Sequence, residues 1–310
     1  MNLVAKITRI LVPTDFSPAA EVACLLAARL ANHLKAGIVL FHAIPGADFL
    51  REMGRARGKT HVEVLYDALA RLQRWFETVV PAEFRAFVSV DVNVEVGEPV
   101  PGMAWVAQQR RADLIVMATH GRTGLVHLLM GSVTEAVLQS IPVPVLALRH
   151  GQGDRPLMAV QRILWATDLS PVSEGAWRYA LTLADALAAE VGLLHVVRPT
   201  GLGGANHARE DTLVPLRREL ERRQQAVEAL GLRGRRKVLV GVPAEVIVAE
   251  AQAERADLIV VGTHGRSGLP HVLVGSVAEA VIRKAPCPVL AVKAEREGEA
   301  SEWETDEAAA

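Results

Sequence analysis

The chain has 310 residues, half of them hydrophobic, and a formal net charge of −1. Because its length is about twice that of a typical domain, we expect two domains. The balanced charge excludes an overall field that would attract nucleic acid or an anionic membrane. No apolar run approaches the roughly 20 residues that span a bilayer, and the N-terminus lacks the layout of a signal peptide. We therefore predict a cytoplasmic protein that binds neither membranes nor nucleic acid.

Short β-branched runs alternate with longer helical stretches along the chain. We predict first-half strands at residues 7–12, 37–43, 87–95, 114–118 and 143–148, and second-half strands at 163–166, 190–197, 236–240, 258–262 and 289–292. Several of these runs are continuously apolar, which is typical of parallel strands that are covered on both faces. The alternation predicts an α/β fold in which each half forms a doubly wound sheet of five parallel strands.

Two kinds of serine signal mark helix starts. A Ser-Pro pair, at residues 17–18 and 170–171, places a capping side chain before a proline whose fixed φ suits the first helical position. An S-x-x-E sequence, at residues 132–135 and 276–279, has the spacing of a capping box. We expect these last helices to begin just after the glycine that precedes each serine.

The two halves repeat one another. The sequence ADLIVMATHGRTGLVHLLMGSV at residues 112–133 returns 144 positions later as ADLIVVGTHGRSGLPHVLVGSV, and RILVPTDFSPAAEVA at residues 9–23 returns 153 positions later as RILWATDLSPVSEGA. The difference predicts an insertion of nine residues in the first half, within residues 46–59, and insertions of this kind lie in surface loops.

These boundaries predict four segments. We assign one domain to residues 1–149 and a second to residues 161–293, joined by a polar, glycine-containing linker at residues 150–160. The tail at residues 294–310 has seven acidic residues against one basic, and we predict that it is disordered.

The polar and glycine residues fall where such a fold places ligands, beyond the carboxyl ends of the strands at the point where the winding reverses. The first strand of each half ends at Thr14 and Asp15 or at Thr167 and Asp168, and the fourth strand runs directly into a glycine loop. Glycine lets the backbone approach a ligand closely, and the amides at a helix N-terminus attract anions. If the first and fourth strands are neighbours, these elements face one crevice suited to phosphate.

Three ordered motifs, ILVPTDFS, G-x2-G-x9-G-S and PxPVLAL, together resemble the universal stress protein family, and here they occur as a tandem. The resemblance covers nearly all of both halves. It implies a Rossmann-like sheet in the order 3-2-1-4-5, pairing of the two domains through their last strands, ATP binding and a role in the stress response.

The resemblance also implies the binding residues. Aspartate and the backbone of the second strand would hold adenine, the first glycine would approach ribose, and the later glycines with the following Ser-Val would hold phosphates. The second-half set is Thr167, Asp168, Val196, Gly262, Gly265, Arg266, Gly275, Ser276 and Val277. The first-half set, which we expect to be weaker, is Thr14, Asp15, Ala43, Ala118, Gly121, Arg122, Gly131, Ser132 and Val133.

One residue in each half affects how well these sets would bind a nucleotide. Arg266 adds a permanent cation whose forked guanidinium suits phosphate. Ala118 replaces the first glycine of the motif, and its methyl group takes space at the ribose approach and disfavours a positive φ. Structural alternatives stay open: the motif serines could only cap helices, and Asp15 and Asp168 could only form Asx turns.

Other chemistry has weaker signals. The recurring histidines at 42 and 195, 120 and 264, and 127 and 271 do not form a metal-ligand pattern, so we expect hydrogen-bonded structural histidines and no metal site. The two cysteines, Cys24 and Cys287, form no CxxC pattern and are expected in the core. Residues 217–237 carry eight basic and three acidic side chains without aromatic interleaving, which favours a solvated helical face.

The sequence lacks a G-x4-GK-[ST] motif, a lysine after the phosphate glycines and a G-x-S-x-G elbow. We therefore predict a regulatory nucleotide-binding protein, not an enzyme, which takes ATP, with Mg²⁺ as its counterion, and acts on an unidentified protein partner. Two alternatives stay open: a scaffold with vestigial sites, and a slow ATPase. Association of two chains as a homodimer is also left open.

Overall fold

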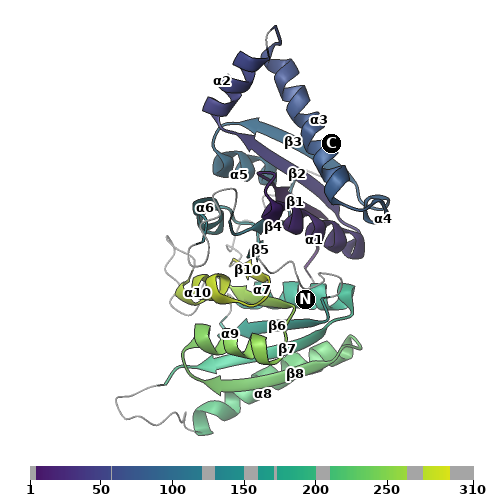
Figure 1. Ribbon diagram of the computed structural model, residues 1–310. Coiled ribbons are helices and arrows are strands. Elements are labelled where there is room, and N and C mark those ends of the chain that lie inside the picture. Colours follow the sequence, from purple (N-terminus) through teal and green to yellow (C-terminus); the bar gives the residue numbers. More distant parts are fainter. Residues whose placement is uncertain are drawn as a thin grey trace, which may run out of the picture. The chain divides into compact units, whose positions relative to one another are not determined.

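The computed structural model describes residues 5–56, 58–120, 130–149, 160–170, 173–199, 210–263 and 275–293. The chain divides into two compact units, one made mainly of residues 6–160 and the other mainly of residues 161–284. Each unit is an α/β structure with parallel strands, as predicted (Figure 1). The predicted linker at residues 150–160 and the acidic tail lie almost wholly outside the described residues.

The first unit forms a five-stranded sheet in the order β3-β2-β1-β4-β5, which confirms the predicted order. Helices α1 and α3 cover one face of this sheet, and α5 and α6 cover the other. Its elements are β1 (Arg9–Pro13), α1 (Pro18–Leu34), β2 (Gly37–Ile44), α2 (Gly46–Arg55), α3 (His61–Val79), α4 (Ala82–Arg85), β3 (Val90–Val96), α5 (Pro99–Gln109), β4 (Leu114–Ala118), α6 (Ser132–Ser140) and β5 (Val145–Leu148).

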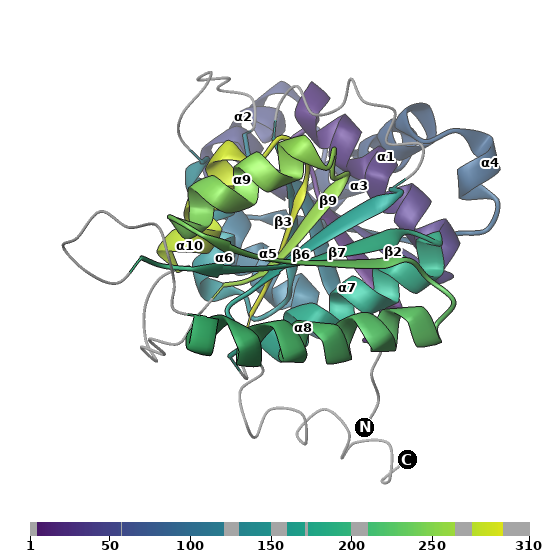
Figure 2. The ribbon, with the colours of Figure 1, turned by 90° about the horizontal axis from the view of Figure 1, so that it is seen from below.

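The second half repeats this order as β8-β7-β6-β9-β10. Figure 2 shows α7 and α8 on one face of this sheet and α9 and α10 on the other. Its elements are β6 (Arg162–Thr167), α7 (Ser173–Leu187), β7 (Glu190–Val197), α8 (Glu210–Ala229), β8 (Gly234–Val240), α9 (Pro243–Ala253), β9 (Leu258–Gly262), α10 (Ser276–Lys284) and β10 (Val289–Val292). The pairing of the two halves through β5 and β10 stays a prediction.

Burial explains why the central strands are apolar throughout. Leu114, Ile115 and Val116 of β4 are fully buried, as are Ile259 and Val260 of β9. A strand that is covered on both faces has no solvent side on which polar residues would alternate.

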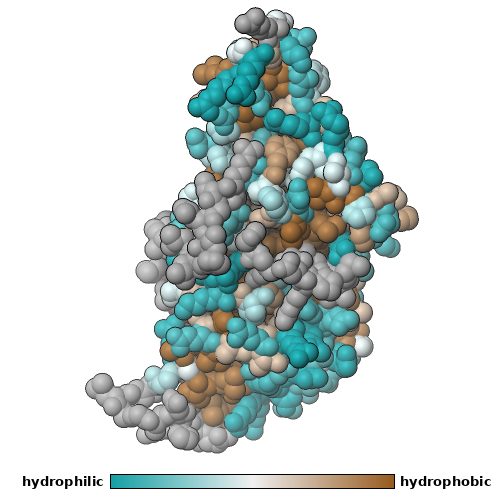
Figure 3. All heavy atoms as spheres, viewed as in Figure 1, coloured by the Kyte–Doolittle hydropathy of each residue, from teal (hydrophilic) through white to brown (hydrophobic). Residues whose placement is uncertain are grey.

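Helix α3 shows the amphipathic pattern of a covering helix. Val64, Ala68, Leu72 and Phe76 are buried against the sheet. Figure 3 shows the surface over this helix as predominantly hydrophilic. None of the helices in the described ranges is long and apolar enough to cross a membrane.

Two predictions about the fold were wrong, and the other predicted strand bounds lie within two residues of the observed ones. Residues 46–59 are not simply a surface loop, because α2 occupies most of them and buries Phe49 in a cluster with Ile44, Val64 and Ala68. The third strand begins at Val90 and not at Phe87. Phe87 lies before the strand and is 77% exposed, so it is not part of the core.

Candidate functional site

The first and fourth strands of each half are neighbours, which is the condition for a shared crevice. In the first half Ile10 of β1 is in register with Leu114 of β4, and in the second half Ile163 of β6 is in register with Leu258 of β9. The carboxyl ends of these parallel strands therefore meet at one edge of each sheet. That edge is where a doubly wound fold binds its ligands.

Both aspartates form tight turns at this edge. The Ser17 amide donates to Asp15 Oδ1 at 3.0 Å, and the Ser170 amide donates to Asp168 Oδ1 at 3.0 Å. These contacts confirm the Asx-turn role that the sequence left open. A carboxylate accepts about four hydrogen bonds, so the turn alone does not exhaust either aspartate.

The residue after each aspartate has a left-handed backbone, with φ of 64° at Phe16 and 60° at Leu169. Its amide turns back to the preceding threonine hydroxyl, Phe16 to Thr14 and Leu169 to Thr167, each at 2.9 Å. Thr14 and Thr167 are thus parts of the turn that presents the aspartate. Both threonines are buried, which fixes the turn against the sheet.

Residues of the second strand lie at the same edge. The Thr14 amide donates to the carbonyl oxygen of Phe41 at 2.8 Å, which brings Ala43 of β2 close to the end of β1. In the second half Thr167 is in register with His195, the residue before Val196. The backbone positions expected to recognise adenine therefore lie near the aspartate turns.

The buried histidines support these turns. His42 Nδ1 lies 2.8 Å from the Thr14 carbonyl oxygen, and His195 Nδ1 lies 2.8 Å from that of Thr167. His120 Nδ1 lies 3.0 Å from Thr119 Oγ1. The prediction of hydrogen-bonded structural histidines is confirmed for these three. The other three recurring histidines, at residues 127, 264 and 271, lie outside the described residues.

Each glycine loop returns to the end of the strand it left. The Gly131 amide donates to the Thr119 carbonyl oxygen at 2.8 Å, and the Gly275 amide donates to that of Thr263 at 2.6 Å. A Cβ atom on Gly131 would lie only 2.8 Å from the same Thr119 oxygen, although its φ of −62° suits any residue. Gly131 is therefore required for space, and its own amide is already used within the protein.

The capping-box prediction was wrong for α6, although the predicted helix start was right. Gly131 is the N-cap, Ser132 is the first helical residue, and no side chain caps this terminus. The Glu135 amide bonds to the Gly131 carbonyl oxygen at 3.0 Å, and in the second half Glu279 bonds to Gly275 in the same way. Because Ser132 lies one position past the cap, its exposed hydroxyl has no capping role there.

Ser276 and Val277 likewise open α10, as Ser132 and Val133 open α6. The first amides of a helix have no partner within it. They carry partial positive charge from the aligned peptide dipoles. In each half a helix N-terminus of this kind is thus tied to the end of the fourth strand, beside the aspartate turn.

Ala118 and Gly262 are the last residues of β4 and β9. Neither is among the described residues with positive φ. The alanine of the first half therefore causes no backbone strain. The remaining loop predictions, Gly121, Arg122, Gly265 and Arg266, lie outside the described residues.

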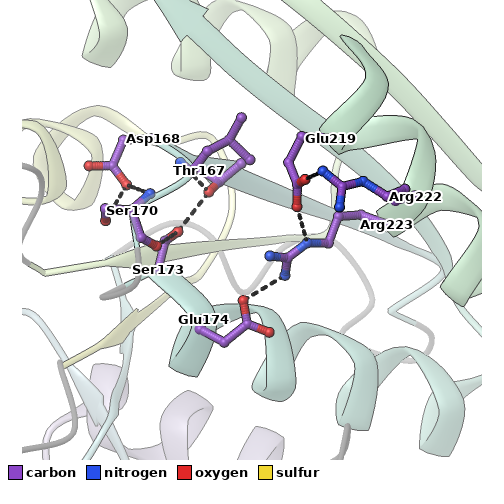
Figure 4. A network of polar contacts seen from close by, with 9 residues as sticks. Thr167, Asp168, Ser170, Ser173, Glu174, Glu219, Arg222 and Arg223 are labelled. Carbon is purple, nitrogen blue, oxygen red and sulfur yellow. Dashed lines mark hydrogen bonds and ion pairs between the residues drawn. The ribbon is translucent and has the colours of Figure 1, made fainter. Parts of the chain in front are cut away.

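The sequence did not single out Ser173, which the structure places beside the aspartate turn of the second half (Figure 4). The Thr167 hydroxyl donates to Ser173 Oγ at 2.9 Å, and the Ser173 hydroxyl donates to the Ser170 carbonyl oxygen at 2.7 Å. The signal was present in the repeat, because the first half has Ala20 at the equivalent position.

Several charged residues of α8 and β8 form ion pairs within the protein. Arg223 bonds to Glu174 at 2.8 Å and to Glu219 at 3.2 Å, and Arg236 bonds to Glu221 at 3.1 Å. Much of the positive charge of residues 217–237 is thus neutralised locally. Within the described ranges, no group of three or more His, Cys, Asp or Glu residues could hold a metal ion.

The family model and the individual relatives that match this chain all point to the same family. The model of the universal stress protein family matches residues 6–149 and 159–293. The universal stress protein MJ0531 of Methanocaldococcus jannaschii is 39% identical over 139 residues, which cover 43% of this chain and 82% of that protein. A universal stress protein of Mycolicibacterium smegmatis is 26% identical over 296 residues, which cover 92% of this chain and 96% of that protein.

The fold agrees with a solved relative. The crystal structure of a universal stress protein from Archaeoglobus fulgidus matches with a TM-score of 0.67 and 22% identity, covering 92% of this chain and 98% of that chain. Two successive matches to the family model cover most of the sequence. The chain therefore belongs to the universal stress protein family.

Proposed function

We propose that the second half binds an adenine nucleotide, ATP with Mg²⁺, at the carboxyl ends of β6 and β9, and that occupancy regulates binding of a protein partner in a stress response. The observation that carries this proposal is the bond of 2.6 Å from the Gly275 amide to the Thr263 carbonyl oxygen. It holds the N-terminus of α10 at the strand edge that also presents Asp168. A helix N-terminus in this position favours phosphate.

The residues present fit such a ligand. Asp168 and the backbone near Val196 would hold the base, and Gly262 would leave room for ribose. The amides and hydroxyl of Ser276 and Val277 would hold phosphate, while the amide of Gly275 stays with Thr263. Gly265 and Arg266 complete the proposed set from the sequence. Mg²⁺ would neutralise part of the triphosphate charge.

The first half is the weaker candidate. It has the same turn at Asp15 and the same helix start at Ser132, together with Thr14, Ala43 and Val133. At Ala118, however, a methyl group occupies the position that a ribose would approach. We propose that any nucleotide binding there is weaker than in the second half.

Turnover is not part of the proposal. Residues 263–275, which join β9 to α10, contain no lysine, aspartate or glutamate, and Asp257, which precedes β9, accepts the Gln161 and Arg162 amides at 2.9 Å at the amino-terminal ends of the strands. Rapid phosphoryl transfer depends on positioned cations and a group that orients the nucleophile. We therefore expect binding without efficient hydrolysis. The cytoplasmic location and the partner stay predictions.

Calorimetric titration of the full chain, stripped of ligand, with ATP and Mg²⁺ tests the proposal. A stoichiometry near one supports a site in the second half, and a stoichiometry near two adds the first half. Absence of binding up to millimolar ATP would overturn the proposal in favour of the scaffold alternative. Release of ADP at enzyme-like rates, measured in the same samples, would overturn the expectation of slow or absent turnover.

A further inference from the structure

The aspartate turns of the two halves share their sequence pattern but differ in one residue that contacts the turn. Positions 153 apart correspond, so Ser17 matches Ser170 and Ala20 matches Ser173. In the first half the Ser17 hydroxyl accepts the Ala20 amide at 3.2 Å and caps α1. In the second half the Ser173 amide bonds instead to the Ser170 carbonyl oxygen, at 3.0 Å.

Ser173 joins this turn to the end of β6 through a continuous chain of hydrogen bonds. The Leu169 amide donates to Thr167 Oγ1 at 2.9 Å, the Thr167 hydroxyl donates to Ser173 Oγ at 2.9 Å, and the Ser173 hydroxyl donates to the Ser170 carbonyl oxygen at 2.7 Å. Ser173 is only 5% exposed. Hydrogen bonds in such a buried chain polarise and strengthen one another, so they hold the turn in a single conformation.

The Ser170 hydroxyl in this arrangement donates to Asp168. The Ser170 Oγ to Asp168 Oδ1 distance is 2.6 Å, and the Ser170 amide donates to the same oxygen at 3.0 Å (Figure 4). A hydrogen bond from a hydroxyl to a carboxylate is charge-assisted and stronger than a neutral one. Two donors from one residue therefore fix the orientation of the Asp168 carboxylate.

The start of α7 is itself anchored from a second helix. Glu174, the neighbour of Ser173, pairs with Arg223 of α8 at 2.8 Å. The Arg223 guanidinium also lies 5.6 Å from the ring centres of Trp165 and Trp177. This partly buried contact holds the residue next to Ser173 in place.

We propose that Ser173 is a positioning residue of the second-half nucleotide site, which acts through Ser170 to orient the Asp168 carboxylate toward the ligand. The inference rests on the proposed function of this site. Ser173 would thus preorganise the second-half site for its ligand, whereas the first half has Ala20 at the equivalent position.

Titration of four full-length proteins with ATP and Mg²⁺ tests this role: the natural chain, Ser173→Ala, Ser170→Ala and the double variant. Each single substitution is expected to weaken binding about three- to tenfold, the net effect of one hydrogen bond. Because both act on the same carboxylate, the loss in the double variant is expected to be smaller than the product of the two single losses, although the Ser170 amide, which Ser170→Ala leaves in place, still depends on Ser173. Residues that act through one another are non-additive in such a cycle.

Thr182→Ala provides the matched control. Thr182 lies on the same helix, and its hydroxyl bonds to the Arg178 carbonyl oxygen at 2.8 Å and accepts the Ala5 amide at 2.8 Å, away from the turn. Its removal is expected to lower thermal stability while leaving ATP affinity unchanged. A general loss of stability is thereby separated from a loss of positioning.

The outcomes separate the two proposals. If the natural chain does not bind ATP, the proposed function fails and this inference fails with it. If the natural chain binds but Ser173→Ala binds equally well, only the inference is overturned. It is also overturned if the losses of Ser173→Ala and Ser170→Ala multiply in the double variant, because Ser173 would then not act through Ser170.

Discussion

Replacement of Gly131 by alanine tests whether the N-terminus of α6 must lie against the end of β4. The added Cβ would lie 2.8 Å from the Thr119 carbonyl oxygen, closer than van der Waals contact allows. Thr119 cannot easily retreat, because it is 1% exposed and its amide donates to the Leu148 carbonyl oxygen at 2.7 Å. The helix start must therefore move away from the strand.

Two effects of Gly131→Ala lower the free energy of unfolding, and one raises it. Overpacking of a dense site costs roughly 1–3 kcal/mol, and weakening the bond from Gly131 to Thr119 costs about 0.5–1.5 kcal/mol. The reduced freedom of alanine in the unfolded chain offsets about 0.4–1 kcal/mol, since the φ of −62° is accessible to alanine. We expect a net destabilisation of about 0.5–4 kcal/mol, mainly from the overpacking term.

Gly54→Ala is the matched control, because it is the same chemical change with the opposite expected sign. Gly54 is an exposed residue of α2, and no atom lies within 4 Å of the position its Cβ would take. Alanine is favoured over glycine in a helix by about 0.8–1 kcal/mol. This variant is expected to be slightly more stable than the natural chain.

Urea denaturation of the full-length variants, combined with hydrogen exchange of the peptides from β4 and α6, measures both effects. Gly131→Ala should lower the midpoint and raise exchange at the ends of β4 and α6, while Gly54→Ala should do neither. An unchanged midpoint and unchanged exchange for Gly131→Ala would refute the reasoning, because the helix start would then tolerate a side chain at the strand end.

Four further outcomes are expected. Ala118→Gly should create or strengthen ATP binding in the first half and raise the calorimetric stoichiometry; no gain would mean that the site is lost for other reasons. Gly265→Val should abolish binding in the second half of a protein that circular dichroism shows to be folded, and unchanged affinity would contradict the assigned loop. Burial, with a smaller contribution from Glu21, raises the pKa of the Cys24 thiol to about 12, so Cys24 should resist iodoacetamide at pH 8 until the protein is unfolded, as peptide mass spectrometry would detect. Arg223→Leu should destabilise the protein by roughly 1–3 kcal/mol, because it leaves two carboxylates without this partner and removes a cation from two indole rings; an unchanged urea midpoint would contradict this role.

The central strands could be predicted from the sequence because their burial is complete. The predicted bounds of β4 and β9, Leu114–Ala118 and Leu258–Gly262, are those of the structure. A strand that is apolar on both faces has the same pattern wherever it lies in the sheet. At β3, an edge strand, Phe87 extends the apolar run but stays in solvent, so composition alone misplaced the strand start.

The helix start of α6 was predicted correctly, but its cap was not, because a long-range contact decides it. The spacing of Ser132 and Glu135 fits a capping box, but the Gly131 amide bonds to Thr119, twelve residues earlier in sequence, and this contact makes Gly131 the N-cap. The helix α2 was missed for a related reason. Its only buried residue, Phe49, packs on Val64 of another helix, and a local pattern does not contain that contact.

The two halves of the chain also allow fold requirements to be separated from site requirements. The first half forms its strand end and helix start with Ala118 and Ala20, where the second half has Gly262 and Ser173. The shared fold therefore does not require a glycine or a serine at these positions. Both differences fall at the same edge of the sheet, one at the proposed ribose approach and the other beside the aspartate turn. Residues that the fold does not require, placed together where a doubly wound fold binds ligands, support the proposal that the second half binds a nucleotide.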